Sequence, residues 1–310
     1  MSGDAQKKVV GVGLACLDQL ILWKDTAAPV HENRVLDYST QGGGMVGTAL
    51  TAVARLGGRA EWWGAVGSDW MGRMVLDGLA QEGVDTGQAV TLEGERGPMV
   101  LVCVDGVTGE RHFVYSVGHL GPKVQVGSSE GLRDAGCVLL DGTLHESAVR
   151  AAQEARRLGV PVVADCQWGT GDSTRALLAH VDHAILGEGR TLRQEVEDDY
   201  RRACQLVRDM GPSHVVITLG ARGLVSLDGD RFRQMPAFTV DVVDTTGAGD
   251  VFHGAFCRGL VLGYGTEENL AFASATAALK CRRLGGRAGI PSFGQVTAFL
   301  KERGTAPRGV

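Results

Sequence analysis

The sequence lacks the marks of several protein classes. No apolar stretch among its 310 residues reaches the roughly 18 to 20 residues that a membrane-spanning helix requires, and residues 1–8 contain no apolar core of a secretory signal. The seven cysteines are odd in number and widely spaced, and no two of them form the C-x-x-C pair typical of zinc or redox sites. We therefore expect a cytoplasmic protein, not bound to a membrane, whose cysteines are small buried side chains.

A strong charge of one sign is also missing. The 31 basic and 36 acidic residues leave a net charge of -5 that is spread along the chain, so nucleic acid is not an expected partner. Low-complexity tracts, linkers and internal repeats are absent as well. With 46 glycines and 44% hydrophobic residues, the composition is typical of a globular protein rich in tight turns, and we expect a single domain over residues 1–310.

Short apolar strands alternate with helices in the second half of the chain. The strands are predicted at 137–140, 160–164, 183–186 and 214–219, with helices near 146–158, 172–180 and 190–210. Two further strands are predicted at 9–13 and 60–67. This alternation predicts an α/β fold with a mostly parallel central sheet and helices on both of its faces.

Two segments differ from this rhythm. Residues 14–41 and 98–116 are more polar and alternate weakly, as strands with one wet face do. We predict that they fold together as a small accessory β-sheet. Between them, three glycines precede an apolar helical pattern over 45–56, which predicts a glycine-rich entry to a helix.

The run DTTGAGD at 244–250 carries the clearest chemical signal. Gly247, Ala248 and Gly249 place little side chain between the backbone and a ligand, directly before a predicted helix. Amide groups at the start of a helix are unpaired and lie at the positive end of its dipole, which makes an anion site. Asp250 in the first turn has two interpretations. It is either a capping carboxylate worth about 0.5 to 1 kcal/mol, or a general base for phosphoryl transfer to a hydroxyl group.

This run resembles the C-terminal signature of the PfkB (ribokinase-like) carbohydrate kinases, and the resemblance extends over nearly the whole chain. It implies a ribokinase-like fold in which the small sheet is a lid, and an enzyme that transfers the γ-phosphoryl group of Mg·ATP to a sugar hydroxyl. It implies that Asp250 is the catalytic base and that the amides of Gly247, Ala248 and Gly249 hold the charge on the transferred group. The residues that it assigns to the sugar are Asp18, Gly42, Gly43 and Gly44.

The same resemblance assigns residues to the nucleotide and to metal ions. Thr218, Gly220 and Gly223 match the turn at which family members bind ATP, although G-x-x-G alone is more typical of a plain strand-to-hairpin turn. The family's Asn-x-x-Glu stretch, associated with Mg²⁺ and phosphate, corresponds to residues 187–190 and leaves Glu188 as the candidate. Many members also bind a monovalent cation, K⁺, and the corresponding groups here are Asp244, Thr246 and the loop 282–289.

The predicted lid has two implied roles. Closure over the sugar would exclude water, which competes with the sugar hydroxyl as phosphoryl acceptor. In this family the lid also often pairs with a second subunit, which implies a homodimer. Arg34 and Arg111 both lie in the predicted lid and are candidates to contact an anionic substrate.

Two departures from the family pattern bear on the substrate. Gly47 stands where the helix after the glycines usually carries an asparagine that touches the sugar. Around the DTTGAGD run the chain is most similar to sulfofructose kinases, yet Tyr115 and Thr143 stand where that subgroup offers an amide and an arginine to the sulfonate. Three alternatives stay open: a kinase for an unsulfonated sugar, a sulfofructose kinase, and a non-catalytic sugar sensor of the same fold. A nucleotide-dependent oxidoreductase is disfavoured, because Gly11 and Gly13 lack the third glycine of G-x-G-x-x-G.

Overall fold

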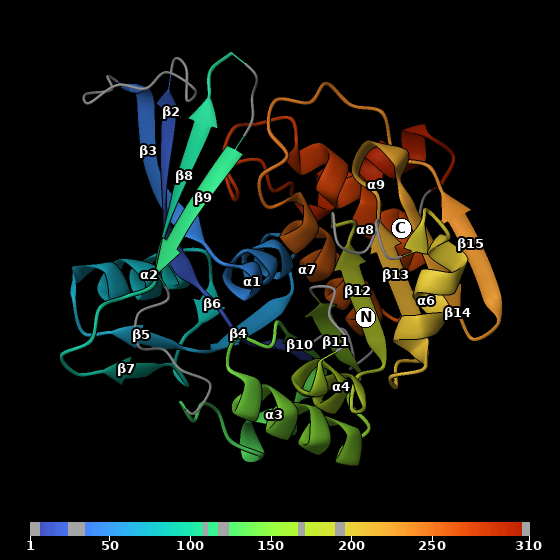
Figure 1. Cartoon of the computed structure of the whole chain (residues 1–310), viewed down its shortest axis with the longest axis horizontal. Coiled ribbons are helices and arrows are strands. Elements are labelled where there is room, and N and C mark those ends of the chain that lie inside the picture. The colour runs from blue at the N-terminus through green and yellow to red at the C-terminus, as the bar shows by residue number, and fades with distance from the viewer. Residues whose placement is uncertain are drawn as a thin grey trace.

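The computed structural model describes residues 7–23, 35–107, 111–116, 124–166, 171–189 and 196–305. Its centre is a nine-stranded sheet with the strand order β15-β14-β13-β12-β11-β10-β1-β4-β6 (Figure 1). The bounds are β1 Lys8–Val12, β4 Arg59–Trp63, β6 Val84–Asp85, β10 Ala135–Leu140, β11 Val162–Cys166, β12 His183–Gly187, β13 His214–Thr218, β14 Leu224–Asp228 and β15 Arg231–Met235. The neighbouring strands from β13 to β6 are parallel, and β14 and β15 add an antiparallel hairpin at one edge. The mostly parallel sheet is therefore confirmed.

Helices cover both faces of this sheet. Their bounds are α1 Met45–Arg55, α2 Trp70–Gln81, α3 His145–Arg157, α4 Asp172–Leu178, α6 Tyr200–Arg208, α7 Ala248–Leu262, α8 Thr266–Lys280 and α9 Phe293–Glu302. Apolar side chains of α3, α4 and α6 form one core with the sheet, and those of α1, α2, α7, α8 and α9 form a second core on its other side. Strand β1 contributes side chains to both cores, because successive residues of a strand point to opposite faces of the sheet. Val10 and Val12 lie in the first core and Val9 lies in the second. In the part of the chain that the structure describes, none of these helices combines the length and apolarity that a bilayer crossing requires.

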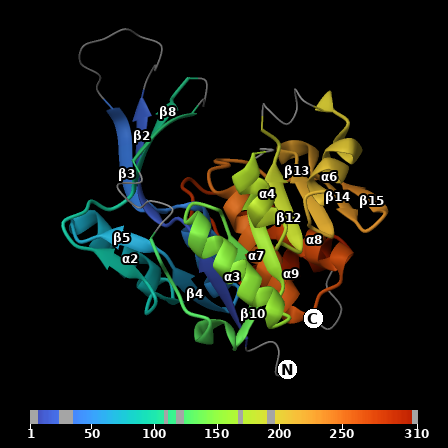
Figure 2. The ribbon, with the colours of Figure 1, turned by 60° about the horizontal axis from the view of Figure 1, so that its bottom comes forward.

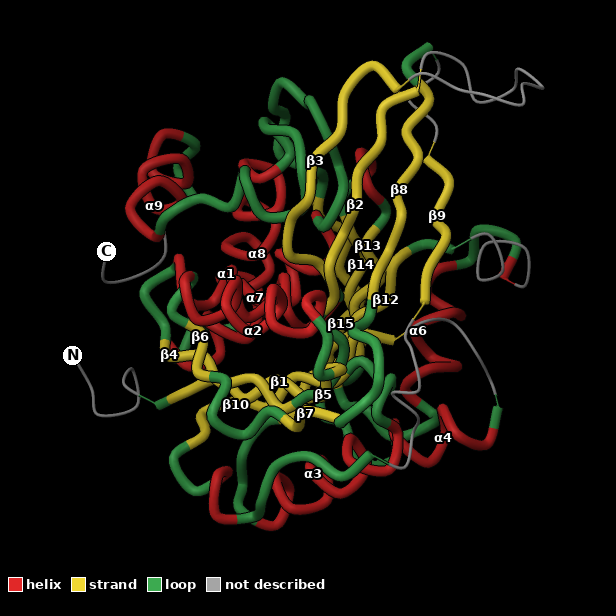
Figure 3. The backbone as a smooth tube through the Cα atoms, turned by 90° about the vertical axis from the view of Figure 1, so that its left-hand side faces the viewer, coloured by secondary structure: helices red, strands yellow, loops and turns green. Residues whose placement is uncertain are grey.

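A second, four-stranded sheet stands apart from the main body (Figure 2, Figure 3). Its strand order is β3-β2-β8-β9, with β2 Cys16–Trp23, β3 Val35–Gly43, β8 Met99–Asp105 and β9 Arg111–Ser116. These strands come from the two polar, alternating segments. The register pairs Asp18 with Gln41 and with Val100, and Val100 with Tyr115, so these four residues share one face of the small sheet.

The single strand predicted over 60–67 is wrong in one respect. The segment is divided into β4 and β5 (Ala65–Gly67), and β5 pairs with β7 (Val90–Leu92) in a separate two-stranded sheet. The break falls at Gly64, where a Cβ atom would collide with the indole ring of Trp62. A glycine inside a strand pattern marks such a close approach, and here it ends one strand and begins another.

Candidate active site

Four aspartates converge at the carboxyl ends of the parallel strands. Asp165 lies one residue before the end of β11, Asp141 directly follows β10, and Asp18 lies in β2 of the small sheet. Asp250 lies in the first turn of α7, a helix that packs against β10, β11 and α1. The other three aspartates all act electrostatically on Asp250. Negative charge is thus concentrated at the edge of the sheet where open α/β sheets bind their ligands.

The pKa of Asp250 is strongly perturbed by this setting. Burial, followed by the negative charges of Asp165 and Asp18, raises the pKa of Asp250 well above its ordinary value. The guanidinium of Arg287 opposes this rise, and the charge of Asp141 adds to it. A carboxylate of raised pKa is a stronger proton acceptor than an ordinary one once it is ionised, which is what a general base requires.

The turn before Asp250 is anchored by Asp244. The Asp244 carboxylate accepts hydrogen bonds from Thr246 N (2.9 Å), Thr246 Oγ1 (2.8 Å) and Gly285 N (2.8 Å). Burial alone would raise the pKa of Asp244, but these bonds and the charge of Lys280 outweigh burial and hold the pKa below its usual value. Asp244 is therefore ionised at neutral pH and fixes the shape of the turn.

Gly247, Ala248 and Gly249 form the start of α7. Gly247 adopts the left-handed conformation (φ 72°), and a Cβ atom there would come within 3.0 Å of Gly286 O, so the position requires glycine. The Ala248 amide donates to Thr245 O (3.1 Å), whereas a Cβ atom on Gly249 would meet no neighbour within 4 Å. The space before the helix is therefore open on the Gly249 side, where an anion can approach the positive end of the helix dipole.

The glycine run 42–44 is built around Asp18. Asp18 is buried (9% exposed), and a side chain on Gly43 would collide with its carboxylate. Gly44 has φ 83°, and a Cβ atom there would lie 2.6 Å from Leu14 O, so the chain can enter α1 here only with glycine. The residues that the sequence assigned to the sugar therefore lie side by side in the structure.

Arg287 is a residue of this region that the sequence alone did not reveal. It follows α8, is 6% exposed, and donates to Gly43 O (2.7 Å) and to Thr48 Oγ1 (3.4 Å). Burial raises the pKa of Asp18, and the charge of Arg287 opposes that rise, as it does for Asp250. Arg287 is therefore a buried cation that faces two of the four converging aspartates.

Gly47 makes room for this guanidinium. A Cβ atom on Gly47 would lie 2.7 Å from Nη2 of Arg287, and one on Gly42 would collide with Nη1. The space that the resemblance assigns to an asparagine side chain at position 47 is thus occupied by a cation from a different segment. Arg287 and its acceptor Gly43 are 244 residues apart, so the sequence does not show that they are in contact. The missing side chains at positions 42 and 47 are the only sign of this contact in the sequence.

The residues predicted to bind the nucleotide lie at the ends of β12 and β13. Glu188 N donates to Thr218 O (2.9 Å), which joins the ends of the two strands. Gly220 (φ 59°) and Gly223 (φ 92°) enclose the short helical turn Gly220–Arg222 that leads to β14. A Cβ atom on Gly220 would meet no neighbour within 4 Å, so this turn presents bare backbone to solvent.

Glu188 is held by Tyr200 and Arg222. Its Oε1 accepts a short hydrogen bond from the Tyr200 hydroxyl and forms a short ion pair with Arg222. Hydrogen bonds to Glu188 and Tyr200 in turn raise the pKa of Arg222. Among the described residues, no group of three or more His, Cys, Asp and Glu side chains is arranged to hold a metal ion.

Four positions bear on an anionic substrate. Arg34 lies outside the described residues, and Arg111 is the first residue of β9. Tyr115 is 72% exposed on the face of the four-stranded sheet that carries Asp18. Thr143 borders a cavity of about 290 Å³ together with Asp141. Tyr115 and Thr143 offer no positive charge, so a sulfonate would find no cation at these two positions.

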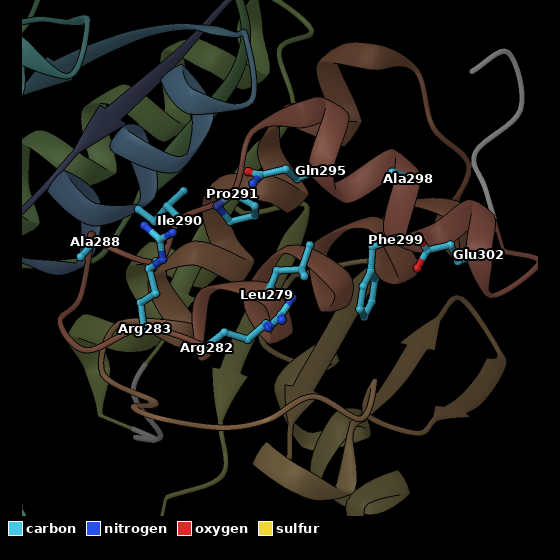
Figure 4. A pocket seen from close by; sticks show the side chains of 11 residues that line it. Leu279, Arg282, Arg283, Ala288, Ile290, Pro291, Gln295, Ala298, Phe299 and Glu302 are labelled. Atoms are coloured by element: carbon cyan, nitrogen blue, oxygen red, sulfur yellow. The ribbon is translucent and has the colours of Figure 1, made fainter.

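A separate cavity of about 490 Å³ lies between the end of α8, the loop 282–291 and α9 (Figure 4). Its lining includes Arg282, Arg283 and Glu302 beside apolar side chains such as Phe299. None of the four converging aspartates lines it. This cavity is therefore separate from the cluster of four aspartates.

Comparison with known proteins agrees with this geometry. The sequence profile of the pfkB family of carbohydrate kinases matches residues 6–292. The chain is 30% identical over 276 residues to the ribokinase of Haemophilus influenzae, covering 86% of this chain and 89% of that protein. It is 28% identical over 290 residues to the aminoimidazole riboside kinase of Salmonella typhimurium, covering 85% and 89%.

The fold has a close counterpart among solved structures. It superposes on the ribokinase of Arabidopsis thaliana, solved with ribose and ATP, with a TM-score of 0.84 and 25% identity, covering 95% of this chain and 99% of that one. Both chains match over almost their full length. The chain belongs to the pfkB family of carbohydrate kinases, which transfer a phosphoryl group from ATP to an alcohol group.

Proposed function

We propose that this kinase transfers the γ-phosphoryl group of Mg·ATP to a hydroxyl group of a small sugar or sugar derivative, with Asp250 as general base. The observation that carries the proposal is the environment of Asp250, a carboxylate of raised pKa in the first turn of a helix whose start is open on the Gly249 side. A proton acceptor next to an anion site is what phosphoryl transfer to an alcohol requires.

In the proposed reaction the sugar hydroxyl lies between Asp250 and the γ-phosphate. Asp250 takes the hydroxyl proton as the new O–P bond forms, and the bond from the γ-phosphorus to the bridging oxygen breaks and releases ADP. The amides of Gly247 and Gly249 and the dipole of α7 stabilise the charge on the transferred group. Magnesium bound with the nucleotide neutralises phosphate charge.

Asp18 and the glycine run 42–44 are proposed to hold the sugar. The charge of Arg287 favours the ionised forms of Asp18 and Asp250, so both carboxylates can accept hydrogen bonds from hydroxyl groups. Because Arg287 is itself balanced by these two carboxylates, it does not act as an additional site for an anion. This balance favours an unsulfonated sugar over sulfofructose.

The nucleotide is proposed to lie along the ends of β12 and β13. The bare backbone at Gly220 leaves room for ATP to approach the turn, next to Thr218, whereas Gly223 makes room for the carbonyl oxygen of Met235. Glu188 and its partner Arg222 lie at the same end of the sheet and supply one carboxylate and one guanidinium. These groups suit a metal-bound triphosphate that points toward the start of α7.

The four-stranded sheet is proposed to close over the sugar and to pair with a second copy of the chain. Tyr115 is 72% exposed on the face that carries Asp18, and Tyr38 and Val114 are 74% and 61% exposed on the opposite face. Apolar surface on both faces of a single sheet suits one face that covers a substrate and one that meets another subunit.

A substrate panel tests the proposed function. The protein is incubated with ATP, Mg²⁺ and a series of ketoses, aldoses, nucleosides, sugar phosphates and sulfofructose, and ADP is followed by a coupled assay. We expect ADP formation to be stimulated by at least one compound, and the highest kcat/KM to identify the substrate. Intact ATP binding with no stimulation by any compound would instead support a non-catalytic sensor.

A further inference from the structure

Lys280, the last residue of α8, brings an ammonium group into the interior against the turn that precedes Asp250. Its side chain is completely buried (0% exposed). Nζ donates a hydrogen bond of 3.0 Å to the carbonyl oxygen of Asp244. A lysine in the last turn of a helix ordinarily extends into water, where it also favours the helix dipole. The inward direction of Lys280 therefore points to a specific role for its charge.

The carbonyl group that Lys280 contacts belongs to the anchor of the turn. The side chain of Asp244 accepts bonds from Thr246 and Gly285, and its amide donates to Cys281 O (3.1 Å), the residue next to Lys280. Asp244 is thus fixed through its amide, its carbonyl and its carboxylate. Two of these three contacts are made by Lys280 and its neighbour at the end of α8.

This contact decides whether a monovalent metal ion fits. The family resemblance assigns K⁺ to the groups near Asp244, Thr246 and the loop 282–289. An ion held by backbone carbonyls here would compete for Asp244 O, which already accepts a hydrogen bond from the ammonium of Lys280. A second positive charge beside a buried ammonium is repelled strongly, because solvent screens it little. The residues present therefore do not fit K⁺ in addition to Lys280.

We propose that the ammonium of Lys280 is a built-in monovalent cation, which takes the place of K⁺ and makes turnover independent of monovalent salts. The inference rests on the proposed function of the turn in phosphoryl transfer. An ammonium carries one positive charge and donates to carbonyl oxygens, the same groups that would coordinate K⁺. By holding Asp244 O, Lys280 keeps the start of α7 and Asp250 in place. Lys280 is a positioning residue that acts through the turn.

The first test compares turnover of the wild-type protein in K⁺, Na⁺ and tetramethylammonium salts at constant ionic strength. A fixed ammonium needs no added ion, so kcat is expected to agree within about twofold in all three salts. An increase of roughly tenfold or more in K⁺ over tetramethylammonium would overturn the proposal.

The second test removes the ammonium. Lys280→Ala leaves space beside Asp244 O, and we expect its kcat in tetramethylammonium to fall by about 10- to 100-fold. K⁺ or NH₄⁺ is expected to restore most of the loss in a saturable manner, whereas Lys280→Met fills the space and is not restored. Lys301→Met, on the exposed surface of α9, is the matched control and should keep the wild-type rate. Loss of turnover in Lys280→Ala that no cation restores would show a merely structural role and would refute the inference.

A measurement without turnover separates this inference from the proposed function. If no sugar is phosphorylated, the Tm of Lys280→Ala still reports the cation site, and we expect K⁺ or NH₄⁺ to raise it by about 2 °C or more over tetramethylammonium. No ion-specific rise would refute the built-in cation. Should Lys280→Ala fail to fold, the rate or the Tm of the wild-type protein in the three salts decides the question alone.

Discussion

Replacement of Asp250 by asparagine is expected to change activity and stability in opposite directions. Asp250→Asn keeps the size of the side chain in the first turn of α7 but removes the proton acceptor. General-base catalysis contributes about 10²- to 10⁴-fold, so kcat is expected to fall by that factor, which corresponds to about 3 to 5 kcal/mol of activation free energy. The affinity for ATP is expected to change little, because the turn at Gly220 and Gly223 is untouched.

The stability of the variant follows from the pKa of Asp250. Burial and the charges of Asp165 and Asp18 raise that pKa in the folded protein above its unfolded value. The stability that a group of raised acidic pKa contributes is fully present when it is protonated, and is lost as pH rises from the unfolded pKa through the folded pKa. At neutral pH, Asp250→Asn is therefore expected to be more stable than the wild-type protein and to have a higher Tm. Near pH ~4 the gain is expected to vanish.

Three measurements check these expectations. A coupled ADP assay at saturating ATP and sugar gives kcat, calorimetric titration gives the affinity for ATP, and thermal unfolding at acidic and neutral pH gives the stability. Asp241→Asn changes an exposed aspartate shortly before the turn and is the control. A kcat of Asp250→Asn within about threefold of wild type would remove Asp250 from the mechanism. A lower Tm at neutral pH would contradict the repulsion among the four aspartates.

Other consequences concern the sugar, the pH dependence of stability and the lid. Gly47→Asn is expected to raise the KM for the sugar by about tenfold or more while the KM for ATP stays unchanged. The reason is that its Cβ atom would lie 2.7 Å from Nη2 of Arg287 and displace the guanidinium. Steady-state kinetics with both substrates measure the two KM values. Burial raises the pKa of Asp141 to about 6. The stability that protonated Asp141 contributes is therefore fully present below its unfolded pKa and is lost as pH rises through about 6. Asp141→Asn is expected to remove this pH-dependent loss of stability, which urea unfolding measures across the same pH range. If the stability of the variant fell with pH as steeply as that of the wild type, Asp141 would not be its cause. The wild-type chain is expected to sediment as a dimer and Tyr38→Asp as a monomer, so a monomeric wild type would exclude pairing through the lid.

The turn at 244–250 could be predicted because its chemistry is local. Asp244, Gly247 and Asp250 lie within one turn and the start of one helix, so their order in the chain nearly determines their geometry. The parallel sheet was also predictable, because each buried strand is a short apolar run followed by a helical pattern. Gly64 was missed because a glycine inside an apolar run does not reveal that the ring of a neighbouring tryptophan covers it.

The positive charges of the site could not be predicted, because they depend on contacts between distant segments. Gly47 taken alone looks like the loss of a polar contact, and only the fold shows that the guanidinium of Arg287 fills the space. Lys280 taken alone looks like an ordinary last-turn lysine that favours the helix dipole. Its burial results from the packing of the 244–247 turn against the end of α8, which no pattern within α8 encodes.

The end of α8 and the short segment that follows it join the two halves of the site. Lys280 donates to the carbonyl oxygen of Asp244 and Gly285 N donates to its carboxylate, while Arg287 donates to Gly43 O on the side proposed to hold the sugar. Aspartates that converge at one edge of a sheet repel one another, and cations from a single segment can offset that repulsion without closing the site to ligands. Changes in this segment should therefore alter kcat and the KM for the sugar together. Changes at the Thr218 turn should alter the KM for ATP alone, because that turn is built from β13 and β14 and makes no use of this segment.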